Sequence, residues 1–161
     1  MYKKMLGMEM DEKNKRVIRY IISKLSDDKT GGRTKLMKLM FLIEHYDIEK
    51  ESIKLVPEIG NDFIIYNYGV FSFSIYNSLI SLIRSGEVKE DGFRLYLNNS
   101  KKVENIKDAK LNKQINNILN KFGGNSKKQL EEFTLKLLGI PITKKIEFMG
   151  IPVKNIIMSL S

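Results

Sequence analysis

Residues 33–47 read RTKLMKLMFLIEHYD, and residues 63–92 read FIIYNYGVFSFSIYNSLISLIRSGEVKEDG. The first segment distributes apolar side chains around nearly the whole circumference of a helix, which predicts a central core helix over residues 34–46. The β-branched and aromatic run at 63–66 predicts a strand that residues 67–69 end. An amphipathic helix is expected from 72 to 85, and a hairpin should follow it with its turn at Asp91-Gly92.

Helical spacing of apolar residues continues on both sides of these segments. Upstream, it begins near Glu12 and continues to Leu25, and residues 1–11 are expected to be an irregular lead-in. Downstream, it predicts helices over 111–122, after the capping pattern at Ser126, and after Pro152. The charged positions Lys35 and Lys38 are expected on a solvent-exposed edge of the central helix.

The order of three helices followed by a hairpin is typical of a winged helix. The sequence therefore predicts a mainly α fold with a small β component (α+β), in one domain over residues 1–161. Within this domain, residues 12–98 should form a winged-helix-like core. Residues 108–160 should form a C-terminal helical extension that packs on the core, because these helices cannot bury their apolar faces alone.

Composition limits the chemistry that the chain can perform. The 161 residues are 42% hydrophobic and 29% charged, and they contain no cysteine and a single histidine, His45. Disulfides, thiolate metal sites and thiol catalysis are excluded, and one histidine cannot form a multi-histidine metal site. We therefore expect no enzyme and assign no catalytic, cofactor-binding or metal-binding residue.

Charge and hydropathy suggest the location and the partners. The net charge of +9 permits an anionic partner, including nucleic acid, although the lysines are scattered along the chain. Every apolar run is shorter than the ~20 residues that span a bilayer, so no membrane association is expected. The first ten residues lack a continuous apolar stretch, so we expect a cytoplasmic protein without a signal peptide.

The two quoted segments also contain a combined motif. It consists of Lys35 to Ile43, then Tyr66 to Ser72, then Ile75-Tyr76. This motif resembles the Lys-Leu-x-Lys-Leu … Tyr-Gly-Pro … Tyr signature of Panacea-type antitoxin domains and phage-associated proteins, and of the related YwgA-like proteins. Val70 stands where that signature usually has proline, and Phe41 where it often has tyrosine.

The resemblance implies a mostly helical, non-enzymatic regulatory module that contacts a protein partner, such as a toxin or a protease adaptor target. The residues expected at the partner site are Lys35, Lys38, Tyr66, Tyr68, Gly69, Phe71 and Tyr76. A purely structural role in the core is the alternative for these residues, because tyrosine rings can cover the apolar helix while their hydroxyls reach polar groups.

A DNA-binding transcriptional regulator is the alternative function. A winged helix would contact DNA through the outer face of its third helix and through the hairpin. The residues expected there are Ser74, Asn77, Ser78, Ser81, Arg84, Lys89 and Arg94. Only Arg84 is basic among the helix positions, and Glu87, Glu90 and Asp91 in the hairpin would repel phosphate, so protein binding is the favoured prediction.

Overall fold

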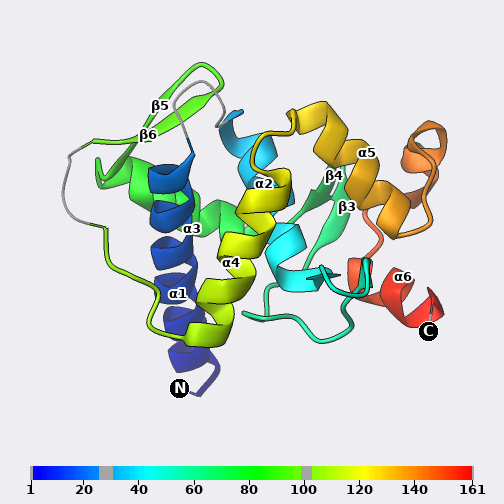
Figure 1. Ribbon diagram of the computed structural model, residues 1–161, viewed down its shortest axis with the longest axis horizontal. Coiled ribbons are helices and arrows are strands. Elements are labelled where there is room, and N and C mark those ends of the chain that lie inside the picture. Colours follow the sequence, from blue (N-terminus) through cyan, green and yellow to red (C-terminus); the bar gives the residue numbers. More distant parts are fainter. Residues whose placement is uncertain (1, 26–30, 99–102, 161) are drawn as a thin grey trace.

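The computed structural model describes residues 2–25, 31–98 and 103–160, and it is mainly helical in this part of the chain (Figure 1). The helices are α1 (Tyr2–Lys24), α2 (Gly32–His45), α3 (Phe73–Arg84), α4 (Ala109–Phe122), α5 (Lys127–Leu137), the 3-10 helix η2 (Ile142–Phe148) and α6 (Val153–Leu160). Three antiparallel hairpins pair β1 (Tyr46–Asp47) with β2 (Ser52–Ile53), β3 (Ile64–Tyr66) with β4 (Gly69–Phe71), and β5 (Val88–Asp91) with β6 (Arg94–Leu97). The predicted fold class, mainly α with a small β component, is confirmed.

Helix α2 is the centre of the fold. Every residue from Lys35 to His45 is buried, as expected of a helix that is apolar around its circumference. Helices α4 and α5 pack against α2, and so do strands β4 and β6. Figure 1 shows α2 in the middle of the molecule, with α1 and α3 on one side and α5 on the other.

Helix α1 packs against α3 and β6. It begins at Tyr2, so the prediction of an irregular lead-in before Glu12 was wrong. Residues 2–11 contain no proline, and seven of the ten are Met, Lys, Leu or Glu. These residue types favour helices through their intrinsic propensity, even when they are exposed. Met8, for example, is 62% exposed.

A buried polar network joins α1, α3 and the chain before β3. The side-chain amides of Asn14 and Asn61 donate to each other's oxygen at 2.9 and 2.8 Å. Ser74 Oγ also donates to Asn61 Oδ1 at 2.7 Å, and Ser78 Oγ donates to Asp11 Oδ1 at 2.6 Å. A buried network whose members are all bonded fixes one arrangement of the elements that it joins.

The connection between α2 and α3 is long. It covers residues 46–72 and contains the β1–β2 and β3–β4 hairpins, whereas a helix-turn-helix joins its helices by a turn of about three to four residues. Glu44 holds the middle of this connection, because its carboxylate accepts hydrogen bonds from the backbone N–H groups of Ile59, Gly60 and Asn61. The order of helix, helix, helix and hairpin is nevertheless the predicted one.

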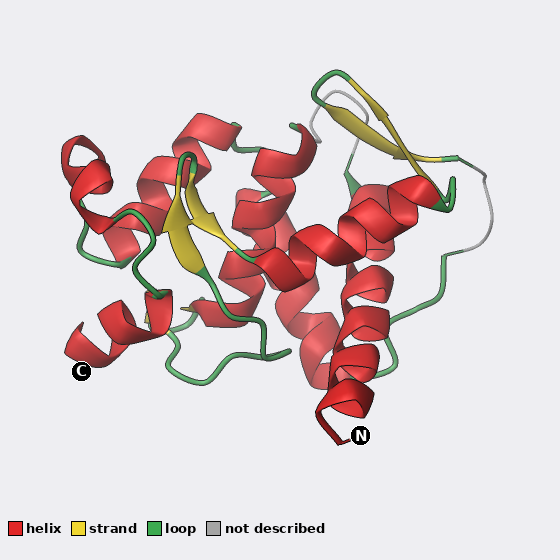
Figure 2. Cartoon of the chain, turned by 180° about the vertical axis from the view of Figure 1, so that it is seen from behind, coloured by secondary structure: helices red, strands yellow, loops and turns green. Residues whose placement is uncertain are grey.

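The C-terminal segment closes the outer edge of β3. Ile65 donates its N–H to the carbonyl of Ile151 at 3.2 Å and accepts from the N–H of Gly150 at 2.8 Å. The chain just before α6 therefore lies along β3, and β4 lies on the other edge (Figure 2). Strand β4 was not predicted, since its three residues are too few to show a periodic pattern.

Candidate functional site

Six of the seven residues predicted at the partner site surround one hollow, which we call the tyrosine groove. Its volume is about 240 Å³, and it lies between the first turns of α2, the β3–β4 hairpin and α3. The lining residues are Arg33, Thr34, Met37, Lys38, Tyr66, Asn67, Tyr68, Gly69, Val70, Phe71 and Tyr76. Only Lys35 of the predicted set lies elsewhere.

Aromatic rings form the wall of the tyrosine groove. Phe71 is at their centre, with its ring centroid 5.4 Å from that of Tyr66, 5.0 Å from that of Phe73 and 5.6 Å from that of Tyr76. Tyr66 and Tyr68, which line the groove, remain 44% and 68% exposed, and Phe73, which packs on Phe71 outside the lining, is 57% exposed. Aromatic residues are enriched at protein–protein interfaces, and a cluster of exposed aromatic rings is a common mark of such an interface.

Gly69 sets the shape of the hairpin in the groove. It pairs with Tyr66 across the turn and has a φ of +95°, which favours glycine over residues with a Cβ. A Cβ at this position would lie 3.3 Å from Cγ of Glu131 on α5 and 3.7 Å from Cε of Lys38 on α2. Glycine therefore allows the hairpin to sit close to both helices.

Lys38 is a buried residue that lines the tyrosine groove. The residue is 1% exposed, and its Nζ donates one long hydrogen bond of 3.5 Å to the carbonyl oxygen of Val70. Burial lowers the pKa of Lys38 to about 8, while the nearby carboxylate of Glu131 opposes this change and the charge of Lys145 adds to it. A buried amine with a lowered pKa in a hollow is a common mark of a functional site.

The charges around Lys38 do not balance. Glu131 already forms an ion pair with Lys145, with 2.9 Å between Oε2 and Nζ, and its side chain is 14% exposed. Lys38, Lys145 and Glu131 therefore have a combined charge of +1 while Lys38 is protonated. The part of the groove that Lys38 lines is thus suited to a negatively charged group.

Arg33 joins the rim of the groove to the β5–β6 hairpin. Its guanidinium forms two hydrogen bonds of 2.6 Å with the carboxylate of Glu90, and it lies over the ring of Tyr76 at 5.7 Å from the ring centroid. The hydrogen bond to Glu90 raises the pKa of Arg33. This bidentate pair leaves the charge of Arg33 neutralised, unlike that of Lys38.

The tip of the same hairpin also touches α2 and α5. A Cβ on Gly32, whose φ is +66°, would lie 2.9 Å from the carbonyl oxygen of Phe93. The Phe93 ring contacts Nζ of Lys127, which is 4.0 Å from its centroid. A second hollow of about 300 Å³ lies beside the tyrosine groove, and it is lined by Thr34, Tyr68, Phe93, Lys127, Lys128 and Glu131.

Lys35 is the predicted site residue that the structure places outside the groove. It is 2% exposed, and its ammonium donates to the carbonyl oxygen of Gly123 at the end of α4 at 2.6 Å. The prediction that Lys35 and Lys38 lie on a solvent-exposed edge was therefore wrong. The covering elements, α4 and α5, come from the C-terminal third of the chain, so the local pattern of α2 could not indicate this burial.

The residues predicted for DNA contact differ in their exposure. Asn77 and Arg84 are exposed on α3, and Lys89 and Arg94 are exposed on the β5–β6 hairpin. Ser81 is half-buried, and Ser74 is bonded within the polar network. Ser78 was predicted to point outward, and this was wrong: it is 1% exposed, because its hydroxyl bonds to Asp11 of α1.

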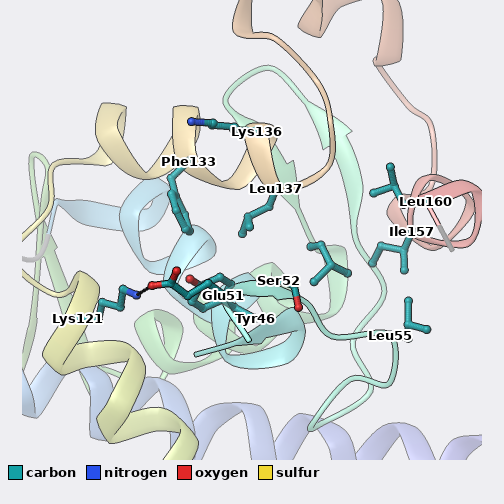
Figure 3. A pocket seen from close by; sticks show the side chains of 11 residues that line it. Tyr46, Glu51, Ser52, Leu55, Lys121, Phe133, Lys136, Leu137, Ile157 and Leu160 are labelled. Carbon is teal, nitrogen blue, oxygen red and sulfur yellow. Dashed lines mark hydrogen bonds and ion pairs between the residues drawn. The ribbon is translucent and has the colours of Figure 1, made fainter. Parts of the chain in front are cut away.

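A larger and more open hollow of about 760 Å³ lies on the other side of α5 (Figure 3). Phe133 and Leu137 of α5 line it from one side and Ile157 and Leu160 of α6 from another. Its charged groups are at the rim, where Lys121 pairs with Glu51 at 3.4 Å. None of the predicted site residues lines it, and it contains no buried charge, so we regard the tyrosine groove as the candidate site.

Residues 2–25, 31–98 and 103–160 contain no group of three or more acidic or histidine side chains placed to hold a metal ion. In the same part of the chain, no helix is both long and apolar enough to cross a membrane. Comparisons with protein-family models, with curated proteins and with solved structures find no match to this sequence.

Proposed function

We propose that the protein is a non-enzymatic regulatory module that binds a segment of a partner protein in the tyrosine groove. The observation that carries this proposal is the gathering of exposed aromatic rings around a hollow that is also lined by Lys38, a buried lysine whose ammonium donates one long hydrogen bond. An antitoxin or an adaptor for proteolysis would act in this way, through contact rather than chemistry. This agrees with the resemblance to Panacea-type antitoxin domains.

An enzymatic role has less support from the groove. Lys38 could act as a nucleophile once deprotonated, but no described histidine or cysteine lines the groove, and its carboxylate neighbours, Glu131 and Glu90, are already paired with Lys145 and Arg33. A catalytic site needs a nucleophile, a base and a group that stabilises developing charge in mutual reach. Binding makes fewer demands, and it uses the aromatic wall directly.

Selection of short peptides from a random library tests the proposal. At least one enriched peptide should bind the purified protein, and Tyr68→Ala should weaken its binding at least about tenfold, since exposed tyrosines at interfaces often carry much of the affinity. Met158→Ala is the matched control, because Met158 is also exposed at 72% but lies on α6. The proposal fails if no peptide is enriched or if Tyr68→Ala leaves binding unchanged.

DNA binding is the competing function, favoured by the net charge of +9. Titration of the protein with mixed duplex DNA at several salt concentrations, followed by fluorescence anisotropy, distinguishes the two. Submicromolar binding that weakens steeply with salt, and that Arg84→Ala reduces, would favour the DNA-binding regulator. We expect no such binding, because Glu87, Glu90 and Asp91 lie on the hairpin beside Lys89 and Arg94.

A further inference from the structure

We propose that the tyrosine groove binds the C-terminal residue of its partner, with the α-carboxylate on Nζ of Lys38 and an apolar side chain among the aromatic rings. This inference rests on the proposed function, because it names the part of the partner that enters the same groove. Three features of the groove support it: the unused donors of Lys38, the local charge and the size of the hollow.

The first feature is the hydrogen bonding of Lys38. An ammonium group has three N–H donors, and those of Lys38 have one acceptor among the described residues, the carbonyl oxygen of Val70 at 3.5 Å. This distance exceeds the 2.7–3.2 Å of ordinary N–H···O hydrogen bonds. A buried ammonium with unused donors is costly, and a carboxylate in the groove would supply the acceptors.

The second feature is the charge that faces this ammonium from the surrounding elements. Glu131 of α5 would repel a carboxylate, but Lys145 of η2 is paired with it at 2.9 Å and offsets the repulsion. Arg33 of α2 is similarly paired with Glu90 of β5. The carboxylate of a ligand would bring the combined charge of Lys38, Glu131 and Lys145 from +1 to zero.

The third feature is size. The groove volume of about 240 Å³ is below the roughly 300–1,000 Å³ of small-molecule sites, so it admits about one large residue. An internal Asp or Glu brings a carboxylate, but the apolar side chain must then come from a neighbouring residue. The C-terminal residue of a chain is different, because its carboxylate and a large apolar side chain belong to the same residue.

The test uses a random peptide library displayed with free C-termini, and then an enriched peptide synthesised both as the free acid and as the C-terminal amide. We expect enriched peptides to end in an aromatic or large aliphatic residue, and the amide to bind at least about tenfold more weakly in fluorescence anisotropy. Lys38→Met should weaken binding of the free acid by a similar factor and leave binding of the amide nearly unchanged. Lys136→Met is the control variant, since Lys136 is an exposed lysine on the opposite side of α5.

The outcomes separate this inference from the function on which it rests. If peptides bind and depend on Tyr68, but acid and amide bind equally or Lys38→Met has no effect, the groove binds proteins and the C-terminal carboxylate is excluded. The same conclusion follows if enriched peptides share an internal motif instead of a common last residue. If no peptide is enriched, or if binding does not depend on Tyr68, both proposals fail.

Discussion

Replacing Lys38 by methionine should stabilise the protein at neutral pH, because it removes a buried ammonium that has only one long hydrogen bond among the described residues. The pKa of Lys38 falls from the ordinary value of 10.5 to about 8 on folding, through burial. At about 1.4 kcal/mol for each pKa unit, the protonated form costs about 3 kcal/mol in the folded state at pH 7. A methionine side chain is similar in length to that of lysine and adapts to apolar surroundings. The substitution removes only the long hydrogen bond from Lys38 to the carbonyl oxygen of Val70.

The sign of the pH dependence follows from the lowered pKa. Between about pH 8 and 10.5 the unfolded chain binds the proton of Lys38 and the folded chain does not, so this group's contribution to stability becomes more favourable as pH rises. The advantage of Lys38→Met should therefore be about 3 kcal/mol at pH 7 and about 1 kcal/mol at pH 10. Comparing the variant with the wild type at each pH cancels the titration of the other residues.

Urea denaturation followed by circular dichroism at pH 7 and at pH 10 measures both values. Lys35→Met is the matched control, because Lys35 is equally buried one turn earlier on α2 but donates a hydrogen bond of 2.6 Å to Gly123. That variant should lose about 1–3 kcal/mol at pH 7, as expected for a bond made by a charged group. The reasoning is refuted if Lys38→Met destabilises the fold at pH 7, or if its effect is the same at both pH values.

Three further predictions concern the hairpin, the polar network and the ligand. Gly32→Ala should destabilise the protein by at least about 2 kcal/mol in urea denaturation, because the Cβ of the new alanine would clash with the backbone of Phe93. The control is Gly86→Ala, which should cost only about 1 kcal/mol, since Gly86 also has a positive φ but has open space around it. Equal losses would contradict the close contact. Asn14→Leu should cost about 3 kcal/mol by thermal or urea unfolding, since it leaves the buried side-chain NH2 group of Asn61 without its acceptor, although Ser74 still donates to Oδ1 of Asn61. Replacement of the exposed Asn77 by leucine should change stability by less than about 0.5 kcal/mol. A C-terminal free-acid peptide should bind at least about tenfold more weakly at pH 9.5 than at pH 7, because Lys38 then loses its proton, and an affinity that is independent of pH would contradict its role.

The sequence alone determined the main elements of the fold. The apolar periodicity and the Asp91-Gly92 turn identified α2, α3 and the β5–β6 hairpin, and the capping box at Ser126 identified α5. These signals are local, because spacing, caps and turn residues act within a few positions of the chain. The same local signals failed for short elements such as β4 and for the beginning of α1.

The sequence also identified most residues of the candidate site, but not how they are arranged. The tyrosines, Gly69 and Phe71 were singled out by their motif, and the structure places them around one groove. Arg33, whose pairing with Glu90 joins the rim to the hairpin, was missed. The two residues are separated by 57 positions, and no spacing rule connects them.

Only the tertiary structure decided the states of Lys35 and Lys38. In the sequence, both are polar positions on an otherwise apolar helix, which normally means a solvent-exposed edge. The packing of α4 and α5, more than 70 residues downstream, buries both of them: it gives Lys35 a carbonyl acceptor and leaves Lys38 with unused donors in a hollow. Burial depends on which surfaces meet in three dimensions, and the periodicity of one helix describes only its own surface.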